Sequence, residues 1–142
     1  MLSVRRCFGL GALAVALLGL QGCGVSTAKP KAEAAVAAFH RQLDAGQFDA
    51  IWDGADESFR NATAHEKYAA FVGAVHRKLG QVVKTTTANW SVRNYNLQTS
   101  VVLLQQTEFE HGSGTETFTY LVKGDAVKLV GYNIQSTELV TL

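Results

Sequence analysis

The spacing of the apolar residues changes at Gly80, and this change constrains the fold more than any other feature of the sequence. Before Gly80, apolar side chains recur every three or four residues, which is typical of helices with one buried stripe. After Gly80, threonines, valines and aromatic residues alternate with polar residues, as in the strands of a half-buried sheet. This order predicts an α+β fold in which helices come first and a sheet follows.

Two helices are predicted before Gly54. The first covers about residues 31–45 and is followed by Gly46, and the second runs from Phe48 to Gly54, because glycine commonly follows the last turn of a helix. The apolar stripe of the first helix consists of Ala32, Ala35, Val36, Phe39 and Leu43.

A third helix is predicted to start at a capping box. Thr63 and Glu66 have the spacing at which each side chain can bond the free backbone N–H of the other residue. The helix should end at Gly80, where a glycine can adopt the left-handed conformation. Its apolar stripe consists of Tyr68, Phe71, Val72, Val75 and Leu79.

Four strands are predicted, at about 81–92, 98–110, 115–123 and 126–135. The connections between them are short, which favours an antiparallel meander. The last connection, Gly124–Asp125, is typical of a two-residue hairpin turn. It places three pairs of residues opposite each other on one face: Val122 and Val127, Tyr120 and Leu129, and Phe118 and Gly131.

The register of this last hairpin predicts the two faces of the sheet. The face toward the helices carries polar residues that could line a pocket, namely Gln105, Thr107, Glu116, Tyr120 and Asn133. The opposite face gathers Leu121, Val130, Tyr132 and Ile134, more apolar surface than a solvated face needs. We therefore expect an interface there, centred on Tyr132, with a second copy of the chain or with another envelope protein.

The sequence contains few groups suited to catalysis. Only Glu116 titrates like a general base, and we expect it near a strand end, where water reaches it and Asn133 pairs with it across the strands. His65 and His76 share a helix face but lie about 16 Å apart, too far for one metal ion. His40 is expected on a helix surface. The sequence therefore predicts no catalytic residue, no metal site and no cofactor.

The first 22 residues have the layout of an export signal. Two arginines precede an apolar run from Cys7 to Leu20, which is shorter than the stretch of about 20 residues that a membrane-spanning helix needs. The next residues, Gln21, Gly22 and Cys23, complete with Leu20 a motif that resembles the lipobox of bacterial lipoproteins. We predict a signal peptide at residues 1–22, cleaved before Cys23.

The lipobox resemblance implies a membrane anchor. The thiol of Cys23 would carry fatty acyl chains such as palmitate, and residues 23–30 would form a short tether to the domain. Cys7 would be removed with the signal, so no disulfide and no cysteine-ligated metal is expected in the mature chain. Gly24 after the cysteine favours the periplasmic side of the outer membrane if the source is Gram-negative.

Other stretches resemble the nuclear transport factor two-like superfamily, also called the cystatin-like cone. They are Leu43–Phe48 with Trp52 after it, Thr115–Thr119 and Lys128–Ile134, which are similar to parts of small bacterial lipoproteins of unknown function with that fold. The resemblance implies a single cone domain over residues 31–136, followed by a C-terminal tail at 137–142. It also implies a cavity between helices and sheet, which some relatives use for isomerisation, dehydration or hydrolysis.

Composition and motifs together favour a non-enzymatic function. The full chain has 13 Lys and Arg against 12 Asp and Glu, so its charge does not favour binding of a nucleic acid. The first hypothesis is a membrane-anchored binding or assembly module of the cell envelope. The alternatives are a pocket enzyme of isomerase or hydrolase type acting on a small apolar substrate, and a purely structural envelope protein. A buried, unpaired carboxylate or histidine would favour the enzyme.

Overall fold

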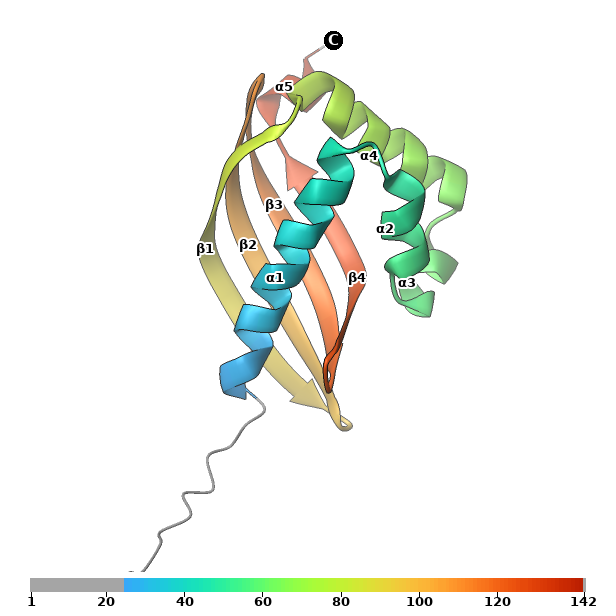
Figure 1. The fold of residues 1–142 in the computed structure, drawn as a ribbon, viewed down its shortest axis with the longest axis vertical. Helices are drawn as coiled ribbons and strands as arrows, with labels where there is room; N and C mark the ends of the chain where they lie inside the picture. The colour runs from blue at the N-terminus through green and yellow to red at the C-terminus, as the bar shows by residue number, and fades with distance from the viewer. Residues whose placement is uncertain (1–24, 142) are drawn as a thin grey trace, which may run out of the picture.

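The computed structural model describes residues 25–141, which form one curved antiparallel sheet with helices packed on one of its faces (Figure 1). The predicted signal peptide and the predicted acylation of Cys23 lie outside the described residues. The elements are α1 Val25–Asp44, α2 Phe48–Gly54, α3 Glu57–Ala62, α4 His65–Leu79, β1 Val82–Tyr95, β2 Gln98–Phe109, β3 Gly112–Lys123, β4 Ala126–Gln135 and α5 Thr137–Val140.

The sheet confirms the predicted α+β class and the meander. Its four strands lie in the order β1-β2-β3-β4, and each pairs antiparallel with the next. Within residues 25–141, none of the helices is both long enough and apolar enough to cross a bilayer.

The helices depart from the prediction in number and in position, because two short helices were missed. The first is α3, in which the Asp56 side chain caps the helix by accepting from the Ser58 N–H at 3.0 Å, while Phe59 is buried. The second is α5, which follows the sheet and occupies part of the predicted tail. It forms where Leu139 packs against the core, so the helices are not all N-terminal.

The first helix begins at Val25, so the prediction of a tether up to residue 30 was wrong from Val25 onward. Its buried stripe extends back to Ala28, which is as inaccessible as Ala32 one turn later. Pro30, which suggested a break, lies inside the helix near its start. A proline there removes one backbone hydrogen bond of the helix.

The predicted capping box does not form. Thr63 is the C-cap of α3, and α4 starts after Ala64, whose side chain makes no capping bond. The chain runs extended through these two residues, which separates Thr63 from the first turn of α4.

The register of the last hairpin changes at a β-bulge. Val122 pairs with Val127 and Tyr120 with Leu129, as predicted, but Thr119 then pairs with Gly131 and Phe118 with Tyr132. The extra residue in β4 is Val130, and it shifts every later side chain of the strand to the opposite face.

This shift corrects the expected pocket lining and the expected interface. Asn133 is exposed on the outer face, opposite Thr117, and does not pair with Glu116. Ile134 is buried and Tyr132 packs against the core, so neither belongs to an outer interface. Of the predicted interface residues, Leu121 and Val130 stay partly accessible.

The core lies between α1 and the inner face of the sheet. The Phe39 ring lies 5.0 Å from that of Phe118 and 4.6 Å from that of Tyr132, measured between centroids. Tyr120 and Leu129 are buried in the same core, as expected. Phe71 is not buried, because its side chain is 39% exposed, and its ring lies 6.0 Å from that of Tyr132 at the margin of the core.

Candidate functional site

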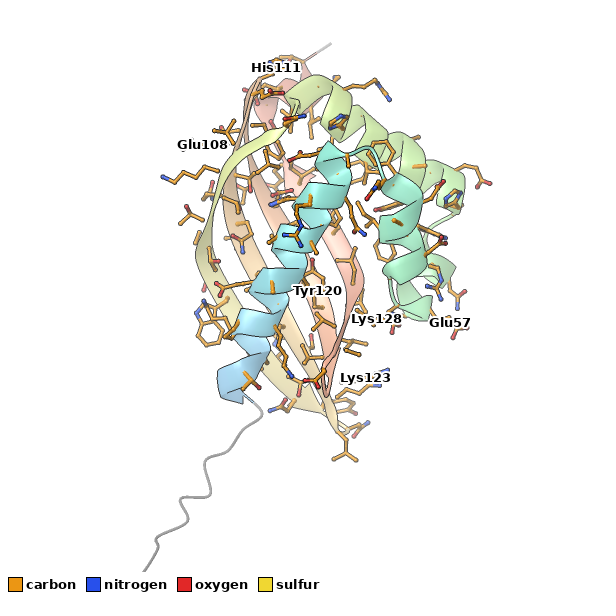
Figure 2. The ribbon with its side chains drawn as sticks, viewed as in Figure 1. Glu57, Glu108, His111, Tyr120, Lys123 and Lys128 are labelled. Carbon is orange, nitrogen blue, oxygen red and sulfur yellow. The ribbon has the colours of Figure 1, made fainter. Side chains whose placement is uncertain are left out.

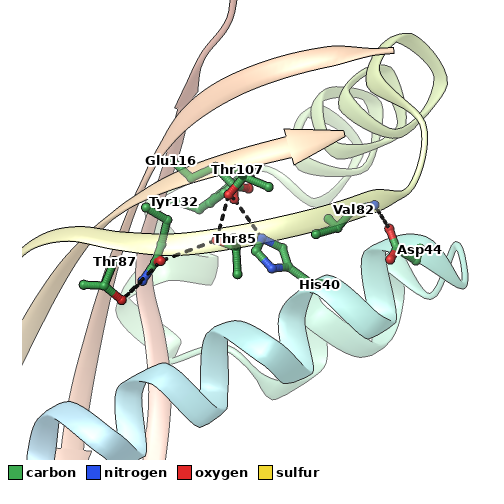
Figure 3. Close-up of polar contacts among 9 residues, drawn as sticks. His40, Asp44, Val82, Thr85, Thr87, Thr107, Glu116 and Tyr132 are labelled. Atoms are coloured by element: carbon green, nitrogen blue, oxygen red, sulfur yellow. Dashed lines mark hydrogen bonds and ion pairs between the residues drawn. The ribbon is translucent and has the colours of Figure 1, made fainter. Parts of the chain in front are cut away.

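Glu116 on β3 is a carboxylate buried at the centre of a hydrogen-bond network (Figure 3). Its Oε2 lies 2.7 Å from Nε2 of His40 and accepts from the Thr107 hydroxyl at 2.6 Å. Its Oε1 accepts from the Tyr132 hydroxyl at 2.8 Å. Three polar side chains from three different elements therefore hydrogen-bond one buried carboxyl group, the condition under which such burial is tolerated.

Each partner comes from the inner face of its element. His40 follows Val36 by four residues, so it continues the buried stripe of α1 and is itself 5% exposed. Thr107 and Glu116 alternate with outward residues on β2 and β3. Tyr132 reaches Glu116 because the bulge at Val130 turned it inward.

The structure thus places four of the five predicted pocket residues on the inner face. Gln105, Thr107, Glu116 and Tyr120 are buried there, while Asn133 is not. The sequence interpretation missed His40, which was expected on a helix surface, and assigned Tyr132 to the wrong face. The sequence does indicate burial of His40, because Ala32, Val36 and His40 recur every four residues along the same helix stripe.

A row of polar side chains links the buried carboxylate to the edge strand. The hydroxyls of Thr107 and Thr85 lie 2.9 Å apart, and Thr85 is exposed on β1. Beside them, the Gln105 amide donates to Thr87 at 3.0 Å, and Thr87 donates to Glu33 of α1 at 2.9 Å. The inner face is therefore hydrogen-bonded from its centre to its β1 edge.

The buried tyrosines differ in how their hydroxyls are satisfied. Burial, reinforced by the charge of Glu116 and the bond to it, raises the pKa of Tyr132 well above its ordinary value. Burial also raises the pKa of Tyr68 and of Tyr120. Among the described residues, the hydroxyls of Tyr68 and Tyr120 have no hydrogen-bond partner. All three phenols therefore stay protonated at physiological pH, but only Tyr132 donates to the network.

A small cavity of about 140 Å³ lies between α1, α2 and the last two strands. Its wall is mostly apolar, and Tyr120 is the one predicted pocket residue that contributes to it, in the space between α1 and the sheet (Figure 2). Its lining residues are Ala35, Ala38, Phe39, Gln42, Ala50, Ile51, Gly54, Tyr120, Val127 and Leu129. Glu116 and His40 are not among them, so a molecule in this cavity would meet no acid or base.

Glu116 and His40 are residue types that can act as an acid–base pair, but both are buried and out of reach of a substrate. A general base must come within hydrogen-bond reach of the proton that it abstracts. Glu116 is already hydrogen-bonded to three side chains and is closed off from solvent. Across residues 25–141, no three His, Cys, Asp or Glu side chains lie close enough to hold a metal ion together. The network can hold α1 on the sheet, and nothing in its geometry exposes a reactive atom.

Comparison with known proteins defines the class to which this α+β domain belongs. Residues 34–132 match the model of a family described as protein of unknown function, DUF4019. The chain belongs to this family. The match extends from α1 to the inward-turned Tyr132 of β4, so it includes all four residues of the Glu116 network.

Two further comparisons add little. One solved structure, Bd1075 of Bdellovibrio bacteriovorus, is 16% identical, with a TM-score of 0.49 over 76% of this chain. The chain covers 40% of the length of that protein. No curated protein matches the sequence significantly.

Proposed function

We propose that the protein is an exported lipoprotein whose folded domain is a non-enzymatic binding or assembly module of the cell envelope. The observation that carries the proposal is the state of Glu116. The carboxylate is buried, fully hydrogen-bonded and absent from the lining of the cavity between α1 and α2. A side chain in this state stabilises a core, whereas an enzyme of isomerase or hydrolase type needs its base facing the substrate.

The anchor is the second part of the proposal. The lipobox-like residues end at Cys23, and α1 begins two residues later, at Val25. An acylated Cys23 would then hold the domain directly at a membrane, which we propose to be the outer membrane. We also propose that the curved sheet with helices on one face is a nuclear transport factor two-like cone. The helix order α1, α2, α4 before an antiparallel meander supports this assignment.

The test of a non-enzymatic function replaces the whole network by apolar residues of similar size, namely His40→Leu, Thr107→Val, Glu116→Met and Tyr132→Phe together. Exchange of a complete buried ionic network for well-packed apolar residues is often neutral or stabilising. The gene is deleted in its own bacterium and the envelope phenotype of the deletion is restored with wild type or variant. We expect a folded variant to restore it fully. A variant that folds, reaches wild-type levels and fails to restore it would show that the chemistry of the network is needed.

The anchor is tested by labelling cells with an alkyne analogue of palmitate. Wild type should take up the label, and Cys23→Ser should remain an unlabelled precursor, because the diacylglycerol that carries the first two acyl chains is attached through that thiol. Equal labelling of both proteins would exclude Cys23 as the site. Fractionation of inner and outer membranes then decides between the two locations.

A further inference from the structure

The turn between β1 and β2 exposes two large apolar side chains that the fold does not need. Tyr95 is 77% exposed and Leu97, the second residue of the turn, is completely exposed. Asn96 and Leu97 have φ angles of 47° and 63°, in the left-handed region that glycine and asparagine tolerate best. Leucine is a poor choice for that conformation, and burial within the domain does not compensate for it. Its presence points to a contact outside the domain.

The position of this turn in the molecule indicates what the contact is. Figure 1 shows the β1–β2 turn, the β3–β4 turn and the start of α1 at the same end of the domain, opposite the C-terminus. Lys31 of α1 fixes part of this arrangement, since its Nζ bonds the Gly124 carbonyl at 2.7 Å and the Asp125 carboxylate at 2.9 Å. Cys23 precedes Val25 by two residues, which span about 7 Å at most. Acyl chains on Cys23 would therefore bring this end of the domain to the bilayer.

The charge at this end suits a lipid surface. Residues 93–98 contain Arg93 and no acid, and Lys123 lies beside the neighbouring turn (Figure 2). The one acid of that turn, Asp125, is neutralised by Lys31. A tyrosine favours the headgroup level, a leucine favours the acyl boundary below it, and an arginine can reach lipid phosphates from a short distance away.

We propose that the β1–β2 turn, through Tyr95 and Leu97, is a second membrane contact that enters the headgroup region of the bilayer and orients the domain on it. This inference rests on the proposed acyl anchor at Cys23. The anchor holds the protein on the membrane, and the turn determines which way the domain faces. The domain then stands with the β2–β3 turn, near His111, pointing away from the lipid (Figure 2).

The experiment uses the full lipoprotein, purified from membranes and reconstituted in vesicles of phosphatidylethanolamine and phosphatidylglycerol. Once the signal is removed and Cys23 is acylated, an added cysteine is the only thiol, so Leu97→Cys can be labelled with an environment-sensitive fluorophore. We expect the label to lose its quenching by aqueous iodide and to be quenched by lipids with a nitroxide near the headgroup. The matched control is Ser113→Cys, exposed at the start of β3 beside the turn at the other end of the sheet, where iodide should quench and the nitroxide should not.

A second variant tests the native side chains rather than the label. The fluorophore is placed at Gln98→Cys, beside the turn, with Tyr95 and Leu97 either intact or both replaced by serine. Removal of the apolar pair should restore iodide quenching. If the labels at 97 and 113 behave alike, or if the serine pair changes nothing at 98, the turn does not contact the bilayer. Intact mass of the same sample reports the acyl chains separately, so failure of the anchor is distinguished from failure of the turn.

Discussion

Glu116 shows how a single buried charge determines the arrangement of four elements. A carboxylate without donors in this position would cost several kcal/mol of desolvation, and His40, Thr107 and Tyr132 remove that cost. Each donor comes from a different element, so the network forms only when α1, β2, β3 and β4 are all in place. The network therefore favours one packing of α1 on the sheet over nearby alternatives.

Removal of the carboxylate should expose this dependence. Glu116→Ala removes the hydrogen-bond partner that His40, Thr107 and Tyr132 share and leaves a cavity in the core, so we expect the free energy of unfolding to fall by about 3–5 kcal/mol. Urea denaturation of the purified domain measures it. The matched control is Glu108→Ala on the outer side of β2, which should leave the midpoint unchanged within error. Similar midpoints for both variants would contradict a stabilising role for the network.

Two tyrosines on the same face should respond in opposite directions to loss of a hydroxyl. The Tyr120 hydroxyl is buried with no hydrogen-bond partner in the described part of the chain, so Tyr120→Phe should raise the free energy of unfolding by about 1 kcal/mol. The Tyr132 hydroxyl donates to Glu116, and Tyr132→Phe should lower it by about 1.5–3 kcal/mol. Thermal and urea unfolding of the two variants, each compared with wild type, decide this. Equal effects in both would show that the two hydroxyls have equivalent surroundings.

At the scale of the elements, periodicity predicted what depends on local spacing and failed where a distant contact decides. The helical stripes and the strand alternation in the sequence match α1, α2, α4 and the four strands. The bulge at Val130 has no such signal, because the Gly124–Asp125 turn sets the register only for the residues that pair next to it. The sequence interpretation therefore placed Tyr132 on the wrong face and missed its hydrogen bond to Glu116. Short helices such as α3 and α5 depend on one apolar contact each, through Phe59, which is buried, and Leu139, which is partly buried against the core, and they show no apolar period.

The early start of α1 gives a test at this scale. Ala28 is completely buried, whereas Ala34 is exposed on the same helix. If residues 25–30 are packed helix, Ala28→Leu overfills its site and should lower the free energy of unfolding by about 1–3 kcal/mol. Ala34→Leu adds the same atoms to a solvated position and should have no such effect. A tether at residues 25–30 would instead leave both variants as stable as wild type.

At the scale of the whole molecule, the helices cover one face of the sheet and leave the other open (Figure 1). The inner face holds the core, the Glu116 network and the small cavity. The outer face carries a row of threonines on β3, at 115, 117 and 119, and on β2 the side chains of Val102, Leu104, Gln106 and Glu108. The β1–β2 turn and this open face are therefore two surfaces available for partners. Packed side chains fill most of the inner face. A pocket enzyme would instead need an accessible base there, which is why we favour a binding or assembly module.

The concentration of buried phenols in one core predicts a loss of stability in alkali. Burial raises the pKa of Tyr68, Tyr120 and Tyr132 in the folded protein, while in the unfolded chain these groups ionise near pH 10. Above that pH the unfolded state has lost protons that the folded state keeps, so the free energy of unfolding decreases as pH rises, by about 1.4 kcal/mol per pH unit for each such tyrosine. Below pH 10 these groups should contribute no pH dependence.

Denaturant unfolding at intervals between pH 8 and pH 11.5 measures this slope. Tyr68→Phe should reduce it above pH 10, because phenylalanine does not titrate, and should raise the free energy of unfolding by about 1 kcal/mol at pH 8, as expected for Tyr120→Phe, since the Tyr68 hydroxyl is also buried with no hydrogen-bond partner in the described chain. The matched control is Tyr95→Phe at the exposed turn, where folded and unfolded chains present the phenol to water alike and the slope should stay as in wild type. A stability that is flat through pH 11, or a slope that Tyr68→Phe and Tyr95→Phe reduce equally, would show that these phenols are not buried in the core between helices and sheet.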